Sequence, residues 1–357
     1  MHKDEYWMRI ALRQAAKAIG ATSPNPAVGA VIVKNNRLIA AGYHHKAGEV
    51  HAEIEALKIA GIDADGAEMY ITLEPCDHYG RTPPCTSAII NSGIKTVIIA
   101  TEDPNPAAAG GIKRLRQSGI TVKVGVCRQA ARKINEVFIT NVNRKRPFVV
   151  MKAAVTLDGQ IATTAGDSGW ISGHISRRYS KRLRARYDSI LIGAKTAKSD
   201  NPVLMPYKKA GKFYRIILDG KLSLDYPNLL SQPDNLVIFC DNETDDAKHK
   251  SIDKKIIIKK INSNKGMLDI KQVLGTIFEM GIMSTFVEGG SLIHRSFLEK
   301  HLYDKAFIFI APKFLGGSGI PLFQGKGVDF MKNAIILKKT ECRKIGKDIV
   351  VSGYFDV

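Results

Sequence analysis

Three potential metal ligands, far apart in the sequence, constrain the fold of the first part of the chain more than any other feature. His51 is followed two residues later by Glu53, Cys76 comes directly after a proline, and Cys85 follows after eight further residues. One imidazole and two thiolates give three protein ligands and leave a fourth tetrahedral position for water, as in a catalytic zinc site. The fold must therefore bring residues 51, 76 and 85 together.

Glu53 is not counted among these ligands, and its position suits proton transfer. Zinc lowers the pKa of a bound water toward neutrality, so that hydroxide becomes available to attack an amino-bearing ring carbon. A carboxylate must then carry the proton to the departing ammonia, and a His-x-Glu paired with a Pro-Cys is typical of zinc deaminases. We also expect Cys76 and Cys85 to lie near helix N-termini, where the helix dipole favours thiolates. Either half of the pattern arises often by chance, but the joint pattern is restrictive.

The expected helices and strands divide the chain into two α/β domains, 1–146 and 147–357. In the first, apolar spacing predicts a helix over 4–19 capped by Asp4, further helices over 51–60 and 84–91, and strands over 28–33, 37–43, 69–73 and 96–100. A basic segment at 144–147 then forms the linker. In the second, we expect strands over 148–152, 189–192, 214–218, 236–240, 285–287 and 306–310, helices over 176–186 and 270–280, and a solvated edge strand at 254–260.

The formal charge of +19 first suggests a nucleic-acid partner. However, the excess is spread along the chain without a basic tail, with +7 on residues 1–146 and +12 on residues 147–357. We therefore favour solubility and attraction for phosphorylated small molecules over a nucleic-acid surface. No apolar run reaches the roughly 18 residues of a membrane helix, the N-terminus lacks the apolar core of a signal peptide, and the five cysteines form no disulfide framework. These features predict a cytoplasmic protein without a membrane partner.

The wide spacing of the two cysteines resembles that of the bifunctional riboflavin-biosynthesis deaminase/reductase family. The resemblance extends over essentially the whole chain. It is carried by His51-Ala52-Glu53, the segment from Cys76 to Cys85, Asn25-Pro26, Gly42-Tyr43-His44, Asp103-Pro104-Asn105-Pro106, Lys152 with Thr156-Leu157-Asp158-Gly159, Gly193, Thr196, Asp200-Asn201-Pro202, Val287-Glu288-Gly289-Gly290 and Pro312-Lys313-Phe314-Leu315-Gly316-Gly317.

This resemblance implies a cytidine-deaminase-like three-layer domain followed by a dihydrofolate-reductase-like α/β domain. It also implies two consecutive reactions on a pyrimidine that bears a ribosylamino 5′-phosphate: zinc-dependent deamination, then NADPH-dependent reduction of the ribosyl chain to ribityl. In the deaminase pocket it implies Asn25, His44, His78 and Asn105. Asn25 and Asn105 stand between prolines and are equally compatible with turns, and His78 with an exposed loop.

In the reductase half the resemblance implies a set of substrate and cofactor contacts. Lys152 would polarise the opening sugar. Substrate contacts would come from Ser168, Arg184, Leu204 and Glu288, and NADPH contacts from Ala154, Trp170, Thr196, Asp200, Gly289, Gly290 and Ser291. The segment Glu288–Ser291 lies between an expected strand and helix, where backbone amides can hold phosphate. Trp170 is equally compatible with a core position, and Thr196 and Asp200 with a capped loop.

One position departs from the family pattern. Relatives often have a second arginine just after the residue at Leu204, whereas this chain has Tyr207 followed by Lys208 and Lys209. A lysine can replace the arginine as a point charge but cannot bind a phosphate in bidentate fashion.

Two other classes of protein compete with this interpretation. A nucleic-acid base deaminase of the tRNA type would share the zinc chemistry, but it leaves residues 147–357 unexplained. A zinc-stabilised binding protein would have no use for the free carboxylate of Glu53. The sequence leaves open whether the protein forms a homo-oligomer.

Overall fold

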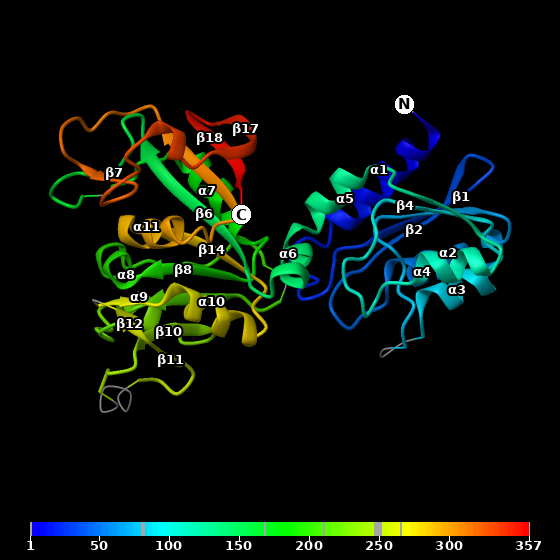
Figure 1. Ribbon diagram of the computed structural model, residues 1–357, viewed down its shortest axis with the longest axis horizontal. Coiled ribbons are helices and arrows are strands. Elements are labelled where there is room, and N and C mark those ends of the chain that lie inside the picture. The colour runs from blue at the N-terminus through cyan, green and yellow to red at the C-terminus, as the bar shows by residue number, and fades with distance from the viewer. Residues whose placement is uncertain are drawn as a thin grey trace. The chain divides into compact units, whose positions relative to one another are not determined.

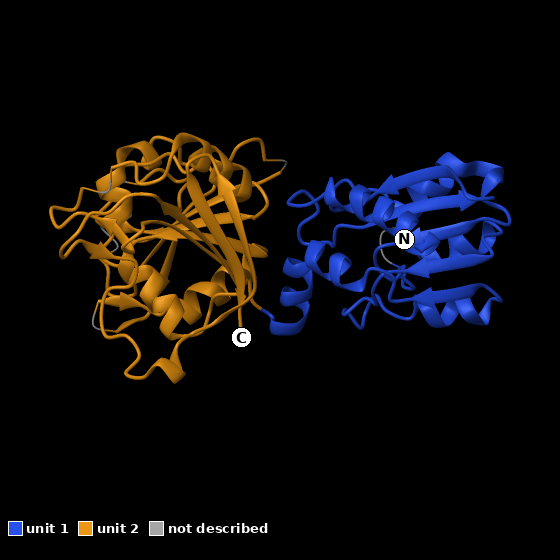
Figure 2. Ribbon diagram, turned by 90° about the horizontal axis from the view of Figure 1, so that it is seen from above, with its two compact units in different colours: residues 1–145 blue, residues 146–357 orange. Residues whose placement is uncertain are grey.

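The computed structural model describes residues 2–79, 83–167, 169–209, 211–245, 252–264 and 266–356. The chain forms two compact units, Met1–Lys145 and Arg146–Val357, which Figure 2 draws in blue and orange. Within the described ranges, no helix has both the length and the apolar character needed to cross a membrane.

The first unit is built on a five-stranded sheet with the order β2-β1-β3-β4-β5. β1 pairs antiparallel with β2 and β3, whereas β3, β4 and β5 run parallel. The strands are β1 (Gly29–Lys34), β2 (Arg37–Tyr43), β3 (Glu68–Ile71), β4 (Thr96–Ile99) and β5 (Thr121–Val124).

Helices cover both faces of this sheet, as Figure 1 shows. Apolar residues of α1 and α5 pack on one face, and those of α2, α3 and α4 pack on the other. The three-layer arrangement implied by the resemblance is therefore confirmed. The helices are α1 (Lys3–Ala16), α2 (Ala52–Ala60), η1 (Gly61–Ala64), α3 (Cys85–Asn91), α4 (Gly111–Gln117), α5 (Arg128–Ile134) and α6 (Glu136–Arg144).

The first helix begins differently from the prediction. His2 is the N-cap residue, and its ring accepts a hydrogen bond from the Asp4 amide at 3.4 Å. The carboxylate of Asp4 instead turns toward the sheet, where it accepts from the Tyr70 hydroxyl at 3.0 Å and pairs with Lys123 at 3.0 Å. The expectation that Asp4 caps the helix was wrong because these partners on β3 and β5 engage its side chain.

The second unit is built on a nine-stranded sheet with the order β11-β10-β9-β8-β14-β6-β15-β18-β17. The strands from β11 to β15 are parallel, and β18 and β17 continue the sheet antiparallel. The strands are β6 (Phe148–Thr156), β7 (Gln160–Ala162), β8 (Ser189–Gly193), β9 (Tyr214–Leu218), β10 (Leu236–Asp241), β11 (Ile257–Ile261), β12 (Ser263–Asn264), β13 (Met267–Leu268), β14 (Ser284–Gly289), β15 (Lys305–Ala311), β16 (Ile320–Pro321), β17 (Leu337–Ile345) and β18 (Asp348–Phe355).

Helices again pack on both faces. Ile277 of α10 and Phe297 of α11 join the core on one face, and Ala197 of α8 and Leu229 of α9 join the core on the other. β11 (Ile257–Ile261) is an edge strand, so the edge strand predicted over 254–260 is present but begins three residues later. The helices are α7 (His174–Arg184), α8 (Ala194–Asp200), α9 (Pro227–Leu230), α10 (Ile270–Glu279), α11 (Ser291–Glu299) and η3 (Met331–Asn333).

The strand order positions the second site. β14 lies between β8 and β6, α8 follows β8, and α11 follows β14. Segments distant in the sequence therefore meet at the carboxyl ends of neighbouring parallel strands, which is where open α/β sheets bind their ligands.

Candidate active sites

The three predicted metal ligands converge in the first unit. His51 directly precedes α2, Cys85 is the first residue of α3, and Cys76 lies in the loop after β3. One donor atom from each residue lies within 4.8 Å of the others, with 3.1 Å between His51 Nδ1 and Cys85 Sγ and 3.7 Å between His51 Nδ1 and Cys76 Sγ. One nitrogen and two sulfurs in so small a space fit zinc, with a fourth position left for water.

The helix position expected for the cysteines holds for only one of them. Cys85 is the first residue of α3, whereas Cys76 lies in the loop that follows β3. The Cys85 amide nevertheless points at Cys76, with 3.5 Å between the nitrogen and Cys76 Sγ. The hydrogen bond from the Cys85 thiol lowers the pKa of Cys76 to about 4, and the same bond raises the pKa of Cys85. Metal binding would require both thiols to lose their protons.

Glu53 lies in the first turn of α2 and is only 3% exposed. Burial raises the pKa of its carboxyl group, although the neighbouring His51 opposes the shift. A carboxyl group with a raised pKa exchanges protons more readily near neutral pH, which is the property that a general acid and base needs. The structure thus brings Glu53 to the metal ligands in a state suited to proton transfer.

Asn25 and His44 lie beside the same ligands. His44 is 3% exposed, and its ring meets the His51 ring edge-on with 5.4 Å between centroids. Its Nδ1 lies 3.1 Å from the Val50 carbonyl oxygen, and its Nε2 lies 3.4 Å from Asn25 Nδ2. Burial lowers the pKa of His44, which favours a neutral ring. The two residues form a polar wall next to His51.

His78 and Asn105 lie in two loops, and neither joins that wall through a described hydrogen bond. His78 is exposed, two residues after Cys76. Asn105 uses its carboxamide oxygen to accept from the Ala107 amide at 3.2 Å, and its own amide donates to Asp103 at 2.8 Å. Asn105 thus has the turn geometry that was the alternative to a pocket role.

Sequence reasoning missed two acidic residues that fix these loops. Glu74 is 7% exposed and accepts from the amides of Asp103, Gly110 and Ile112 at 3.1, 3.1 and 3.0 Å. Asp77 accepts from the Thr86 hydroxyl and from Arg114, each at 2.7 Å. The only signal in the sequence is that both residues flank the predicted ligand Cys76, whose loop they tie to the segment 103–114.

The second site centres on Glu288, which lies near the end of β14. Arg184 of α7 donates to one carboxylate oxygen through Nε and Nη2, at 3.0 and 2.7 Å. Lys152 of β6 lies on the other side, with 3.6 Å between Nζ and Oε2. Burial raises the pKa of Glu288, but the charges of Arg184 and Lys152 outweigh it, so that the pKa lies below its usual range. The site therefore holds a charged carboxylate between two cations.

A cradle opens where β14 turns into α11. Gly290 precedes the helix with φ 82°, a conformation that favours glycine. A Cβ atom at this position would lie 2.9 Å from Thr196 Oγ1, so a side chain would fill the space. The Ser291 hydroxyl is buried and makes no hydrogen bond within the described part of the chain. A glycine turn before a nine-residue helix, with a spare hydroxyl, fits a cofactor phosphate.

The other predicted reductase residues lie on β6, on α8 and in the loop after α8. Ala154 lies on β6 two residues after Lys152, and Leu204 is buried with φ 60°. Thr196 lies inside α8 and Asp200 is its last residue, while Gly193 and Asn201 are the cap residues, so the capped-loop alternative does not hold for Thr196 and Asp200. Gly193 is also the last residue of β8. Ser168 lies outside the described residues.

Two aromatic residues of the second unit, Trp170 and Tyr207, are exposed and lie against cationic side chains. Trp170 is 75% exposed and stacks under Arg177, with 4.1 Å from the guanidinium carbon to the ring centroid, so the core alternative is excluded. Tyr207, at the position that departs from the family pattern, has Arg182 and Lys208 at 5.7 and 5.8 Å from its ring centroid. Its amide donates to the Lys181 carbonyl at 3.1 Å, which ties this loop to α7.

Two family models match the chain. The model described as the cytidine and deoxycytidylate deaminase zinc-binding region matches residues 1–101, and the model described as the RibD C-terminal domain matches residues 147–351. The riboflavin biosynthesis protein RibD of Bacillus amyloliquefaciens is 40% identical over 352 residues, which cover 97% of this chain and 95% of that protein. RibD of Aquifex aeolicus is 40% identical over 358 residues, covering 98% and 97%.

Solved structures agree over the full length. RibD of Acinetobacter baumannii superimposes with a TM-score of 0.88 at 32% identity and covers 99% of each chain. A diaminohydroxyphosphoribosylaminopyrimidine deaminase/5-amino-6-(5-phosphoribosylamino)uracil reductase from Thermotoga maritima gives a TM-score of 0.88 at 36% identity, again covering 99% of each chain. The similarity therefore includes both units.

Proposed function

The chain belongs to the RibD family of riboflavin biosynthesis proteins, and on this premise we propose which of its residues carry the two reactions. It is a bifunctional enzyme that deaminates 2,5-diamino-6-ribosylamino-4(3H)-pyrimidinone 5′-phosphate and then reduces the ribosyl chain, giving 5-amino-6-ribitylamino-uracil 5′-phosphate. We assign the deamination to residues 1–146 and the reduction to residues 147–357. The convergence of His51, Cys76 and Cys85 beside buried Glu53 is the single observation that carries this assignment.

For the deaminase, His51, Cys76 and Cys85 would hold Zn²⁺, which when bound would make a nucleophile available from water at neutral pH. Glu53 would take up a proton and deliver it to the departing amino group, so that one water is consumed and one ammonia is released. The raised pKa of its buried carboxyl group supports this role. Asn25 and His44 bind the pyrimidine, whereas His78 and Asn105 act through their loops.

For the reductase, NADPH supplies the hydride that reduces the sugar carbon. Lys152 gives a proton to the sugar oxygen, so that the ring opens to the ribityl chain and charge is balanced. Glu288 and Arg184 orient the sugar, Leu204 packs against the substrate, and Ser168 completes its contacts. The charged carboxylate between Lys152 and Arg184 supports this division of roles.

The cofactor lies against the turn between β14 and α11. Gly289, Gly290 and Ser291 bind its phosphate through backbone amides and the Ser291 hydroxyl, which fits the space that a side chain at residue 290 would fill. Thr196, Asp200, Ala154 and Trp170 line the remainder of the cofactor site. The exposed ring of Trp170 suits stacking on a flat group.

The substrate phosphate meets a changed set of cations in this chain. In place of the family's second arginine, Arg182 and Lys208 lie around Tyr207. We assign the phosphate to these two side chains. The site then keeps two positive charges but lacks the bidentate hydrogen bonds that the family's second arginine would make to the phosphate.

The experiment that tests the whole assignment supplies the diaminopyrimidine ribosylamino phosphate with and without NADPH and follows products by mass. Without NADPH, exchange of the amino group for oxygen raises the mass by about 1 Da with release of ammonia, and with NADPH the mass rises by about 2 Da more. An unchanged mass in both arms contradicts the assignment.

A nucleic-acid base deaminase is the competing function. The RibD-type second domain and the dispersed positive charge support a phosphorylated pyrimidine small molecule over nucleic acid. A tRNA and a single-stranded DNA offered as substrates should release no ammonia. We further propose a cytoplasmic location without a membrane partner, because a reducing compartment keeps thiols such as Cys76 and Cys85 free to act as ligands.

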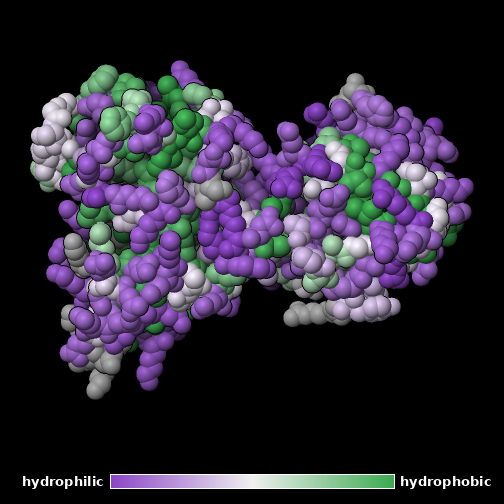
Figure 3. All heavy atoms as spheres, in the orientation of Figure 1, coloured by the Kyte–Doolittle hydropathy of each residue, from purple (hydrophilic) through white to green (hydrophobic). Residues whose placement is uncertain are grey.

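We also propose that the chain forms a homo-oligomer through its second unit. Large apolar side chains are exposed there, among them Phe314, Phe330, Met331 and Ile336, at 75, 64, 88 and 70%. Figure 3 shows hydrophobic residues at the surface of this unit. Exposed apolar area of this kind is typical of a self-association surface. Light scattering after size-exclusion chromatography should give a multiple of 39.2 kDa, and Met331→Ser with Ile336→Ser should reduce it.

A further inference from the structure

Two segments that carry the family resemblance have no role in the assignment above. The first segment, residues 156–159, begins at the last residue of β6, and the second segment, residues 312–317, follows β15. The two strands are parallel neighbours, and Ala311 at the end of β15 lies opposite Thr156 at the end of β6. The register therefore brings both segments to the carboxyl edge of the sheet, where open α/β sheets bind their ligands.

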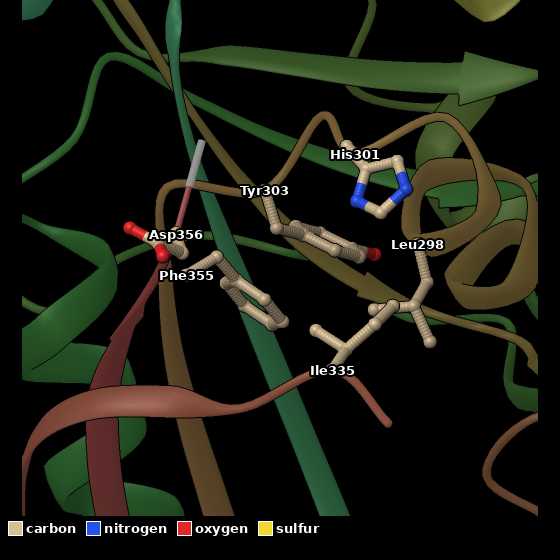
Figure 4. A pocket seen from close by; sticks show the side chains of 6 residues that line it. All are labelled: Leu298, His301, Tyr303, Ile335, Phe355 and Asp356. Atoms are coloured by element: carbon tan, nitrogen blue, oxygen red, sulfur yellow. The ribbon is translucent and has the colours of Figure 1, made fainter. Parts of the chain in front are cut away.

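β15 is a fixed base for the second segment. Tyr303, just before the strand, is 1% exposed and stacks on Phe297 and Phe355, with ring centroids 5.3 and 5.5 Å apart. Figure 4 shows Tyr303 and Phe355 in the wall of a small cavity beside Leu298. All seven residues of β15 then pair with β6. The second segment therefore leaves a strand that is held at its beginning and along its length.

Asp158 joins the two segments through its carboxylate. Oδ2 accepts hydrogen bonds from the amides of Leu315 and Gly316 at 3.1 and 2.8 Å. Oδ1 accepts from the hydroxyl of Thr156, and the oxygen of that hydroxyl accepts from the Gln160 amide at 3.0 Å. The bond from Thr156, followed by that from the Gly316 amide, lowers the pKa of Asp158. Asp158 is thus an ionised acceptor at neutral pH and ties the second segment to the end of β6.

Lys313 connects the second segment to Trp170. The main chain of Lys313 is held on both sides, because its amide donates to the Ala311 carbonyl and its carbonyl accepts from the Leu157 amide, each at 2.8 Å. Its side chain extends to the main chain of Trp170, where Nζ donates to the carbonyl oxygen at 2.9 Å. This contact joins residues that are 143 positions apart in the sequence.

Further contacts to the residues around Trp170 come from α7 and β18. The guanidinium carbon of Arg177 lies 4.1 Å from the centroid of the Trp170 ring, and Nη1 of Arg177 donates to the Ser172 carbonyl at 2.8 Å. The Gly173 amide donates to Asp348 at 2.8 Å. The Trp170 ring is 75% exposed and gains little order from packing, so polar contacts of this kind determine where it lies.

These contacts form one chain from the reductase strand to the aromatic ring. Lys152 and Thr156 are four residues apart on β6 and therefore lie on the same face of the sheet. Thr156 donates to Asp158, Asp158 holds the segment that contains Lys313, and Lys313 holds the main chain of Trp170. The position of Trp170 is thereby set relative to the strand that carries Lys152.

We propose that Asp158 and Lys313 are positioning residues of the reductase, which hold the main chain of Trp170 so that its ring is presented to NADPH. This inference rests on the proposed function of Trp170. A segment that is already ordered in its bound conformation binds more tightly, because less conformational freedom is lost on binding. The two residues therefore act on the affinity for NADPH and not on the chemical step.

Fluorine NMR of protein that contains 5-fluorotryptophan reports on the ring directly, without NADPH. The chain has two tryptophans, and Trp7 is in the first unit, so Trp170→Leu assigns the two resonances. Lys313→Met removes the donor but keeps an unbranched side chain, and the Trp170 resonance should narrow and move toward that of the free amino acid. Asp158→Asn should have a similar effect, because one acceptor oxygen is lost. The Trp7 resonance should stay in place in both variants.

Calorimetric titration with NADPH measures the consequence for binding. Lys313→Met should raise Kd by about 3-fold to 10-fold. Its kcat at saturating NADPH should stay within about twofold of the wild-type value, which also shows that the second unit is folded. Lys313→Arg can still donate to the carbonyl and should bring Kd within about twofold of wild type. Lys326→Met is the matched control and should leave Kd unchanged, since Lys326 is 80% exposed and pairs with Asp329 at 3.1 Å.

An unchanged Trp170 resonance in Lys313→Met or in Asp158→Asn overturns the positioning role of the residue replaced. An arginine variant that binds NADPH as weakly as Lys313→Met, or equal weakening in Lys326→Met, overturns the role of Lys313 as well. If Lys313→Met does not fold, Lys313→Ala replaces it, with the same expected results.

Trp170→Leu separates this inference from the proposed function. If Trp170→Leu binds NADPH as tightly as the wild type, the cofactor role of Trp170 fails, and the positioning role fails with it. If Trp170→Leu binds weakly while Lys313→Met and Asp158→Asn bind with wild-type affinity, only the positioning role fails.

Discussion

Arg184 donates both Nε and Nη2 to a single carboxylate oxygen of Glu288, at 3.0 and 2.7 Å, although 104 residues separate them in the sequence. Its remaining nitrogen Nη1 donates to the Met205 carbonyl at 3.0 Å. All three contacts depend on the planar fork of the guanidinium group. The arginine therefore fixes the carboxylate and the loop after α8 at the same time.

Arg184→Lys should weaken reduction without affecting deamination. A lysine keeps the charge but cannot make the paired bonds to Glu288 and the bond to residue 205 together. We expect kcat/KM for the deaminated substrate to fall by about 10-fold to 100-fold. Arg186→Lys, an exposed arginine two residues later, is the matched control and should stay within about twofold. Equal losses in the two variants would show that the specific geometry of Arg184 is not needed.

Glu53→Gln should stop ammonia release but keep zinc. The amide retains the size of the carboxyl group and cannot carry a proton, so the rate should fall by about 10²-fold to 10⁴-fold. Metal analysis should still find one zinc per chain. Glu55→Gln is the control, since Glu55 lies on the same helix but bonds the Tyr43 amide and His45. Loss of zinc in Glu53→Gln, or unimpaired turnover, contradicts the assigned role.

Removal of zinc should separate the two activities. A chelator at neutral pH should abolish deamination, because His51, Cys76 and Cys85 are the ligands. NADPH oxidation on substrate that is already deaminated should continue at the original rate, and added Zn²⁺ should restore ammonia release. Parallel loss of reduction would contradict the assignment of zinc to the first unit alone.

Sequence reasoning located most elements because periodicity is a local signal. The strand beginning at residue 148 and the helix beginning at residue 270 both appear where apolar spacing places them. The metal ligands could be predicted for a different reason: a histidine followed by two cysteines, with a glutamate beside the histidine, is typical of one kind of zinc site. Neither kind of signal depends on tertiary contacts.

Residues whose role depends on distant partners could not be found in this way. Glu74 and Asp77 organise loops through amides and side chains that have no sequence pattern. Asp4 fits the cap pattern but is engaged by Tyr70 and Lys123. His294 meets Tyr303 only after α11 packs on the sheet. In each case a tertiary contact decides what a local rule leaves open.

The buried His294 should make the second unit less stable at low pH. Its pKa is about 3 in the folded chain and near 6.5 when unfolded, so the unfolded chain binds the extra proton first. The neutral His294 ring makes its full contribution to the free energy of unfolding above about pH 6.5. This contribution is lost as the pH falls toward 3, by up to about 1.4 kcal/mol per pH unit. His294→Gln should remove this part of the slope. Pulse proteolysis in urea at pH 5.5 and 7.5 measures the free energy of unfolding of the second unit in the wild type and in His294→Gln. If the two proteins show the same dependence of stability on pH, His294 is not neutral in the folded chain.

Gly290→Ala should weaken NADPH binding specifically. The residue has φ 82°, and a Cβ atom there would lie 2.9 Å from Thr196 Oγ1, in the space assigned to a phosphate. We expect the KM for NADPH to rise by about 10-fold or more, with ammonia release unchanged.

Gly281→Ala provides the matched control for backbone strain. Gly281 has a similar φ of 77°, but a Cβ atom there would meet nothing within 4 Å. Both variants should therefore lose a similar amount of stability, about 1 kcal/mol, because each forces an alanine into the left-handed region. Only Gly290→Ala should change the KM, since only its methyl group enters the cradle. A comparable rise in KM for Gly281→Ala would mean that strain in the second unit, and not the loss of space at α11, reduces NADPH binding.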